Sequence, residues 1–254
     1  MSYGIYLSAD GAQAQAQRME VIANNLANVD TTGFKRQLAV IQARHSEAIE
    51  QGVATENSAT IDDIGGGTLV QETLTDFSTG QLKHTGIPSD VAIDGAGFFE
   101  VQKDGQNFLT RAGNFIVGPG GLLQTSNGYD VLSAGGSQLA MPADVSWRIR
   151  PDGTIVDRKN PGTVFGTLSI VRAQQPGDLV HRGENLFSSL SEPIAVKPGD
   201  VNVRSGYLEM SGVNPTTEMM EMIETTRAFE ANLRVIQNQD AMVDSLLSRI
   251  LRSN

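Results

Sequence analysis

The carboxyl-terminal stretch, residues 214–254, is the feature of this sequence that most constrains its fold. It has no glycine, and no proline after Pro215, and its apolar positions advance by four and three, the 3.5-residue period of a coiled-coil seam. The predicted seam consists of Met222, Thr226, Phe229, Leu233, Ile236, Val243, Leu247 and Ile250, interrupted by Asp240. Asn214 and Pro215 predict an N-cap followed by proline at the first helical position. Such a helix is roughly 55 Å long, too long for one small domain to cover, so we expect it to pack against a partner.

The amino-terminal residues supply a candidate partner, because they repeat the same four-three step. The residues on this stripe are Ile5, Ala9, Ala12, Ala16, Met19, Ala23 and Leu26. Alanines on one face let a second helix approach closely. An alternative interpretation is that both stretches are ordinary amphipathic helices packed on a globular core. Two matched stripes at opposite termini favour a terminal helix pair, formed either within one chain or between chains.

Composition excludes several classes of function. The 254 residues carry a net charge of -10, which disfavours nucleic acid as a partner because phosphate binding needs a surplus of lysine and arginine. No apolar run reaches the ~20 residues of a membrane span, and the first ten residues lack the features of a secretory signal. We therefore expect a cytoplasmic chain or one exported without a cleavable signal. The absence of cysteine excludes disulfides, thiol catalysis and cysteine-ligated metals.

The middle of the chain has the pattern of an all-β domain. All nine prolines fall between Pro88 and Pro215, and the single tryptophan, Trp147, lies in the same interval. Two-residue turn signals separate short apolar runs at Asp94-Gly95, Asp104-Gly105, Asn127-Gly128 and Asp152-Gly153. This spacing predicts a β-barrel or β-sandwich over residues 74–205. We expect the first helix to end near residues 28–33 and 37–73 to be a flexible connection, within which 38–50 could be helix or strand.

Residues that could carry chemistry are sparse. His45, His84 and His181 are far apart and lack metal-ligand spacing, and no phosphate-binding or dinucleotide-binding glycine motif is present, so no metal or cofactor is expected. The acids at positions 62, 63, 90, 94 and 100 could pair as glycosidase carboxylates, which would make the chain a periplasmic β-fold enzyme acting on polysaccharide. Acids beside glycines are more often turn formers in β-proteins. The basic residues Lys35, Arg36 and Arg44 are expected on a solvated face.

Several blocks of this sequence resemble the bacterial flagellar rod and hook proteins. The most specific is NNLANVDTTGFKR at 24–36, with the signature residues Asn24, Asn25, Leu26, Ala27, Asn28, Thr32, Gly33, Phe34 and Lys35. Further blocks are TDFSTGQLKHTGIPSDVAIDGAGFFEV at 75–101, LTRAGNF at 109–115, TSNGYDVL at 125–132 and the segment 205–247. The chain length and LVHRGENLF at 179–187 are more similar to the proximal-rod type than to the distal-rod type. The sequence departs from the family pattern at Gly212, where asparagine is usual, and at Phe229, where tyrosine is common.

The resemblance implies a fold and a role. The fold would be mainly β with terminal α-helices: a discontinuous helical coiled-coil domain plus a central all-β domain. Its segments would be the axial helix and signature turn (1–36), the connection (37–73), the β-domain (74–205) and a C-terminal axial helix (206–254) pairing with 1–30. In the assembled structure the helices would form an inner axial tube and the β-domains an outer layer.

The implied function is that of a non-enzymatic structural subunit of the flagellar basal-body rod, the shaft that transmits torque to the hook for motility. Its partners would be itself, other rod and axial subunits and the flagellar type III export apparatus, with no nucleic acid and no small-molecule substrate. Its location would be the periplasmic rod, reached without a cleavable signal peptide. A distal-rod or hook-family subunit is the nearest alternative.

Overall fold

The computed structural model describes residues 3–43, 49, 65–142, 145–196 and 202–252. The chain divides into two compact units. We call them the helical unit, which contains α1, β1, β2 and α3, and the β unit, formed by Asn28–Arg36 and Phe77–Val213. The described chain is therefore mainly β with one long helix near each end, as the sequence predicts.

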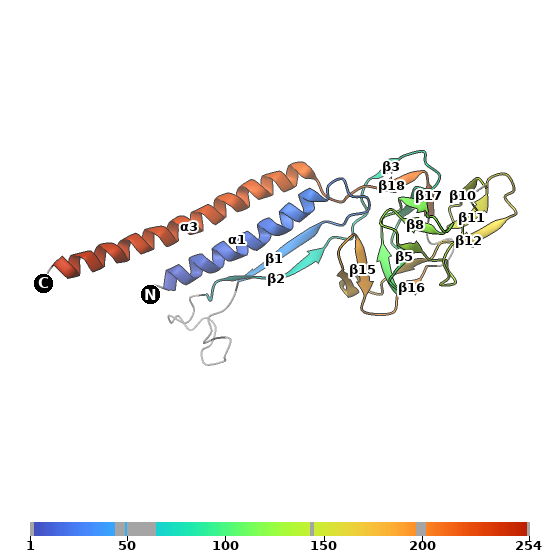
Figure 1. Ribbon diagram of the computed structural model, residues 1–254. Coiled ribbons are helices and arrows are strands. Elements are labelled where there is room, and N and C mark those ends of the chain that lie inside the picture. The colour runs from blue at the N-terminus through green and yellow to red at the C-terminus, as the bar shows by residue number, and fades with distance from the viewer. Residues whose placement is uncertain (1–2, 44–48, 50–64, 143–144, 197–201, 253–254) are drawn as a thin grey trace. The chain divides into compact units, whose positions relative to one another are not determined.

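The helical unit is built from two helices and a hairpin (Figure 1). Helix α1 is Tyr3–Ala27 and helix α3 is Pro215–Arg252. Strands β1 (Gln37–Ala43) and β2 (Thr68–Thr75) pair antiparallel, and their register shifts between Val40 and Ile41. Both strands pack against α1. The part of the expected flexible connection that is described thus forms strands at both ends, and residues 44–48 and 50–64 lie outside the described residues.

Helix α3 begins where the sequence predicts. Asn214 Oδ1 accepts hydrogen bonds from the backbone N–H groups of Thr216, at 3.1 Å, and Thr217, at 3.4 Å. Pro215 follows as the first helical residue, where its missing N–H leaves no unsatisfied donor. The N-cap prediction is confirmed, and the helix then continues for 38 residues because no glycine or further proline interrupts it.

The β unit consists of short antiparallel strands. Their bounds are β3 Leu82–His84, β4 Val91–Asp94, β5 Phe98–Lys103, β6 Gln106–Thr110, β7 Phe115–Val117, β8 Leu123–Thr125, β9 Asp130–Val131, β10 Trp147–Ile149, β11 Thr154–Asp157, β12 Val164–Thr167, β13 Ile170–Arg172, β14 Leu179–His181, β15 Leu186–Ser189, β16 Ile194–Ala195, β17 Asn202–Ser205 and β18 Tyr207–Glu209. The largest sheet has the order β14-β15-β6-β5-β9-β8-β7, with β13 joining β5 to β16. Smaller sheets are β10-β11-β12, β17-β4 and β18-β3.

The predicted turn signals lie at strand connections. Asp104 and Gly105 both have positive φ, 51° and 77°, and they join β5 to β6 in a two-residue hairpin. Gly95, Gly128 and Gly153 also have positive φ, at the turns that follow β4, β8 and β10. These glycines are needed because the left-handed backbone region is costly for residues with a Cβ.

The core of the β unit is apolar and closely packed. Phe99, Val101, Leu123, Val131 and Ile155 are fully buried within one cluster, against which Trp147 packs from the edge. A second cluster centres on Phe98 and Phe187, whose rings also contact Phe77. The β unit therefore has its own hydrophobic core, as a separate domain requires.

Candidate assembly interface

Helices α1 and α3 run antiparallel, side by side, within the helical unit (Figure 1). Three pairs of side chains fix the direction. Asn25 Nδ2 donates to Glu218 Oε2 at 3.2 Å, Arg18 lies 3.7 Å from Glu221, and Thr226 Oγ1 lies 3.8 Å from Met19 Sδ. Asn25, near the end of α1, lies beside the start of α3, whereas Arg18 and Met19, earlier in α1, lie beside residues further along α3, so the two helices run in opposite directions.

Two glycines on α1, Gly4 and Gly11, leave room for side chains of α3. A Cβ added to Gly4 would lie 2.8 Å from Gln239 Nε2, and one added to Gly11 would lie 3.2 Å from Asn232 Nδ2. Polar amides of α3 therefore occupy the space that a side chain on either glycine would need. The sequence analysis assigned this role to alanines and missed the two glycines. Their spacing of seven residues, which places them on the same side of the helix, is the signal that could have identified them.

Asn25, a signature residue, connects three elements of the helical unit. Its side chain is buried, donates to the Gln37 carbonyl at 2.8 Å, and accepts from the Gln37 N–H at 2.9 Å. The same amide reaches Glu218, which is completely buried in the first turn of α3. The end of α1, the start of β1 and the start of α3 are thus held together by one side chain that satisfies the strand's first backbone groups.

The predicted stripe on α1 is distributed over more than one environment. Ala12 is buried, Met19 contacts α3, and Ala9 and Ala23 are exposed. The remaining residues, Ile5, Ala16 and Leu26, are half-buried. Ala14 and Ile22, which the stripe omits, are fully buried. Because β1 and β2 also pack on α1, its buried surface is wider than a two-helix seam.

On α3 the predicted stripe is partly covered and partly free. Met222, Phe229 and Ile236 are half-buried, and Leu233 is 37% exposed. Val243 and Leu247 are 46% and 52% exposed, and the side chain of Ile250 lies outside the described residues.

The boundary between covered and free surface follows from helix length. Gly4, one residue after the start of α1, already lies at the level of Gln239. Residues 241–252 of α3 therefore extend beyond the described part of α1, as Figure 1 shows.

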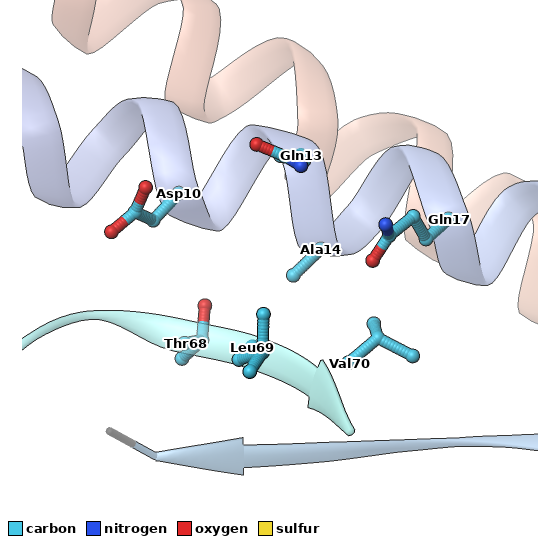
Figure 2. Close-up of a pocket in the computed structure, with 7 residues that line it drawn as sticks. All are labelled: Asp10, Gln13, Ala14, Gln17, Thr68, Leu69 and Val70. Carbon is cyan, nitrogen blue, oxygen red and sulfur yellow. The ribbon is translucent and has the colours of Figure 1, made fainter. Parts of the chain in front are cut away.

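A small polar pocket lies between α1 and the hairpin. Figure 2 shows Asp10, Gln13 and Gln17 of α1 above Thr68 and Leu69 of β2. Its volume is about 60 Å³, so it is of water size rather than ligand size. A Cβ on Gly67 would lie 2.5 Å from Asp10 Oδ2, so this glycine lets the carboxylate settle against the backbone. We interpret the pocket as an imperfectly filled helix-to-sheet contact.

The signature turn is anchored inside the β unit. Gly33 has a φ of 68°, and a Cβ there would lie 2.5 Å from the carbonyl carbon of Arg111. Its N–H donates to the Glu209 carbonyl at 2.8 Å, and the Gly212 N–H donates to the Phe34 carbonyl at 2.9 Å. The segments that follow α1 and precede α3 are thus hydrogen-bonded to each other.

A buried ion network secures this anchor. Lys35 Nζ lies 2.7 Å from Glu209 Oε1 and also donates to the Ser78 carbonyl at 2.6 Å. Arg111 lies 3.1 Å from Glu209 Oε2 and donates to the Gly95 carbonyl at 2.7 Å. The Lys35 and Glu209 side chains are each 1% exposed. The expectation that Lys35 lies on a solvated face is therefore wrong, because a carboxylate 174 positions away in the sequence neutralises it inside the domain.

Burial and charge act in opposite directions on Arg111. Removal from water lowers the pKa of its guanidinium, while Glu209 raises that pKa. Hydrogen bonds to the carbonyls of Ile93 and Gly95 satisfy the guanidinium N–H groups on one side. The network is thus a paired, hydrogen-bonded charge cluster, the arrangement that makes buried charge tolerable.

The acids considered as catalytic are engaged in structure where they are described. Asp94 pairs with Arg204 at 2.5 Å, and Glu100 accepts from Asn107 at 2.9 Å and from Ser169 at 2.8 Å. Asp90 is buried, and residues 62 and 63 lie outside the described residues.

The two described histidines, His84 and His181, pack against aromatic rings, and His45 lies outside the described residues. His84 packs on Tyr207, and His181 packs on Phe187, where burial lowers the His181 pKa. Across the described ranges, no three histidine or acidic side chains are grouped as metal ligands. Helices long and apolar enough to cross a membrane are likewise not found among the described residues.

Comparisons with known proteins match most of this arrangement. The family model described as "Flagella basal body rod protein" matches residues 5–35, which include most of α1 and the signature turn. The "Flagellar hook protein FlgE/F/G D1 domain" matches residues 92–156 of the β unit, and the "Flagellar basal body rod FlgEFG protein C-terminal" model matches residues 204–249.

Individual relatives extend over nearly the whole chain. The flagellar basal-body rod protein FlgG of Bacillus subtilis is 33% identical over 261 residues, covering 98% of this chain and 99% of its own. FlgF of Salmonella typhimurium is 35% identical, with 94% of this chain and 95% of its own covered. FlgF of Caulobacter vibrioides is 28% identical over the full length of both chains.

Proposed function

Because this chain belongs to the flagellar basal-body rod protein family, we propose that it is a proximal-rod subunit that polymerises through its paired terminal helices. The family is structural rather than enzymatic, and its place is the flagellar basal body. The observation that carries the proposed mechanism is the free end of α3, which continues past the described part of α1 with exposed apolar side chains.

The free end supports polymerisation because it is incomplete in a single copy. Met242, Val243, Leu246 and Leu247 are 59%, 46%, 60% and 52% exposed. Fully burying an aliphatic side chain of this size contributes about 1.5–3 kcal/mol, so covering the exposed halves would contribute roughly 4 kcal/mol in all. A rod subunit gains this free energy only when neighbouring subunits cover the helix end.

The anchored signature turn supports a mechanical role. Lys35, Glu209 and Arg111 are buried together, and they tie the segments next to both long helices into the β unit. A shaft that transmits torque needs connections that do not yield under load. A buried ion network with backbone hydrogen bonds around it is a stiff connection of this kind.

Location and partners follow from the same proposal. We assign the chain to the part of the rod that crosses the periplasm, reached through the flagellar type III export apparatus. Its partners are other copies of itself and other rod and axial subunits. A distal-rod or hook-family position is the alternative, and relatives named FlgG as well as FlgF are similar to this chain.

Basal bodies provide the direct test. An epitope can be inserted in the exposed turn at Gly136, and detergent-resistant basal bodies can then be purified and probed for the tag. We expect the chain to co-purify with the rod, and cells lacking it to stop assembly before the distal rod. Complete rods from which the tagged chain is absent would contradict the proposal. Complete proximal rods in the deletion strain would assign the chain to a distal position.

A further inference from the structure

Helix α3 is rich in methionine. Four of the eight methionines of the chain lie on it, at positions 219, 220, 222 and 242. Three of them have large exposed fractions: 52% for Met219, 62% for Met220 and 59% for Met242. A thioether sulfur is polarisable and accepts an oxygen atom from an oxidant, which the hydrocarbon side chains beside it do not. The helix therefore presents oxidisable side chains as well as apolar ones.

The other described methionines are less accessible. Met141 is 3% exposed and belongs to the core of the β unit. Met19, Met210 and Met222 are half-buried, and the sulfur of Met19 lies 3.8 Å from Thr226 Oγ1 within the helix pair. Because an oxidant must reach the sulfur atom, the exposed methionines of α3 should react first and Met141 last.

Met242 is the exposed methionine that lies in the free end of α3, beyond the described part of α1 (Figure 1). Leu246, one turn later on the same side of the helix, is 60% exposed. Asn238 and Ser245, which share that side, are exposed and uncharged. The sulfur of Met242 is therefore open to solvent in a single copy and has an apolar neighbour.

Charged side chains near Met242 do not keep a neutral oxidant away. Asp240 and Asp244 are exposed two positions before and after it, so they point to other sides of the helix. Arg249 is exposed two turns later. Hydrogen peroxide carries no charge, so these groups neither attract nor repel it.

Oxidation of Met242 by a peroxide is a balanced oxygen transfer. The lone pair of Sδ attacks one oxygen of hydrogen peroxide, an S–O bond forms and the O–O bond breaks. The second oxygen leaves with the electrons of the broken bond and takes up the proton of the first, so the products are a sulfoxide and water. Sulfur loses two electrons and the peroxide gains them. Methionine sulfoxide reductases reverse the change.

The sulfoxide alters what the helix end can bury. It replaces an apolar thioether with a polar, chiral group that holds water. A neighbouring subunit that covers the helix end must remove this water. Burying a polar group without a hydrogen-bond partner weakens a contact by roughly tenfold.

We propose that Met242 is a reversible oxidation site, and that its sulfoxide keeps the unassembled chain out of the rod. This inference rests on the proposed function, in which neighbouring subunits cover the helix end, and it adds a chemical control of that step. Once neighbours cover Met242, peroxide no longer reaches its sulfur. The site therefore acts on free chains and leaves finished rods intact.

Mass spectrometry of the methionines tests their exposure. Purified full-length chain and isolated basal bodies are treated with the same dilute hydrogen peroxide, and sulfoxide formation is followed at each position. In the free chain we expect Met219, Met220 and Met242 to react at least about tenfold faster than Met141. In basal bodies we expect Met242 to react at least about fivefold more slowly than in the free chain. An unchanged rate at Met242 would overturn the proposal.

Competition between two tagged chains in the same cells tests the consequence. The natural chain and Met242→Leu, which has an apolar side chain without sulfur, carry different epitopes in the turn at Gly136, in cells that lack methionine sulfoxide reductases. A peroxide pulse during expression should raise the ratio of Met242→Leu to natural chain in basal bodies roughly tenfold over its untreated value. Damage to other subunits affects both chains equally and leaves the ratio unchanged. The matched control is Met141→Leu against the natural chain, whose ratio should stay constant. A constant ratio for Met242→Leu would overturn the proposal.

A substitution that imitates the sulfoxide gives a readout without oxidant. Met242→Gln places an uncharged polar side chain of similar length at the same position. We expect it to enter basal bodies roughly tenfold less than Met242→Leu in the same competition, while the β unit melts normally. Equal incorporation of the two variants would count against the proposal.

These results can be told apart from failure of the proposed function. If the inference about Met242 is wrong, the untreated natural chain still co-purifies with basal bodies. If the proposed function is wrong, the untreated natural chain is absent from them.

Discussion

Replacing Glu209 by glutamine tests the buried anchor of the signature turn. The substitution keeps the shape of the side chain but removes a carboxylate that lies 2.7 Å from Lys35 and 3.1 Å from Arg111. The amide also presents a donor where Lys35 and the Gly80 N–H now donate to Glu209 Oε1. Two buried cations then lose the counter-charge that they share.

The expected loss is large. Breaking a buried ion pair by removing one partner costs about 3–5 kcal/mol, and the two cations here share the lost carboxylate. For a domain of this size 1 kcal/mol corresponds to roughly 2–4 °C, so the β unit should melt roughly 10 °C lower. Trp147, which packs at the edge of the core, reports this transition by fluorescence.

Asp94→Asn is the matched control, because it makes the same chemical change in an exposed pair. Asp94 and Arg204 are 41% and 45% exposed, and pairs of this kind contribute about 0–1 kcal/mol. We therefore expect the control to melt within about 3 °C of the natural chain. If Glu209→Gln were no more destabilising than Asp94→Asn, the buried network would not be what holds the signature turn.

Three further predictions concern the helix seam, the signature glycine and one histidine. Ile236→Asp should leave the melting of the β unit unchanged yet exclude the chain from basal bodies, because a carboxylate would replace a half-buried apolar side chain in the helical unit, whereas a polar change at exposed Asn238 should be neutral in motility assays. Gly33→Ala should destabilise the β unit by at least ~2 kcal/mol more than Gly128→Ala in denaturant titrations, since both have positive φ but only Gly33 faces backbone at 2.5 Å. Burial lowers the His181 pKa below its usual 6.5, so the unfolded chain binds more protons and the β unit should lose stability as the pH falls through that value; His181→Phe should remove this component from the pH dependence of melting.

Much of the fold is predictable because its signals are local. The N-cap at Asn214, the long uninterrupted helix after it, and the turns at Asp104-Gly105 and Asp152-Gly153 all depend on residues adjacent in the sequence. The alternation of short strands and turns likewise predicts the β unit. Because neighbouring residues determine these elements, they can be predicted from a single sequence.

What the sequence leaves undecided depends on contacts between distant segments. Lys35 looks like a surface residue until Glu209 is known to lie beside it, and nothing near Lys35 in the sequence reveals that carboxylate. The residues of β1 alone do not decide between helix and strand, because the partner strand β2 begins 25 positions after β1 ends. The glycines Gly4 and Gly11 acquire their role only once α3 lies against them.

Removing the free end of α3 tests the central claim most directly. A chain ending at Asp240 keeps the contacts between α1 and α3 at Gly4 and Asn25, and loses the exposed apolar side chains of Met242, Val243, Leu246 and Leu247. The measurement is the amount of this truncated chain in purified basal bodies, compared with its amount in the medium and in the cells. The account predicts a chain whose β unit melts normally but which is absent from basal bodies of non-motile cells. Incorporation at the level of the natural chain would contradict it.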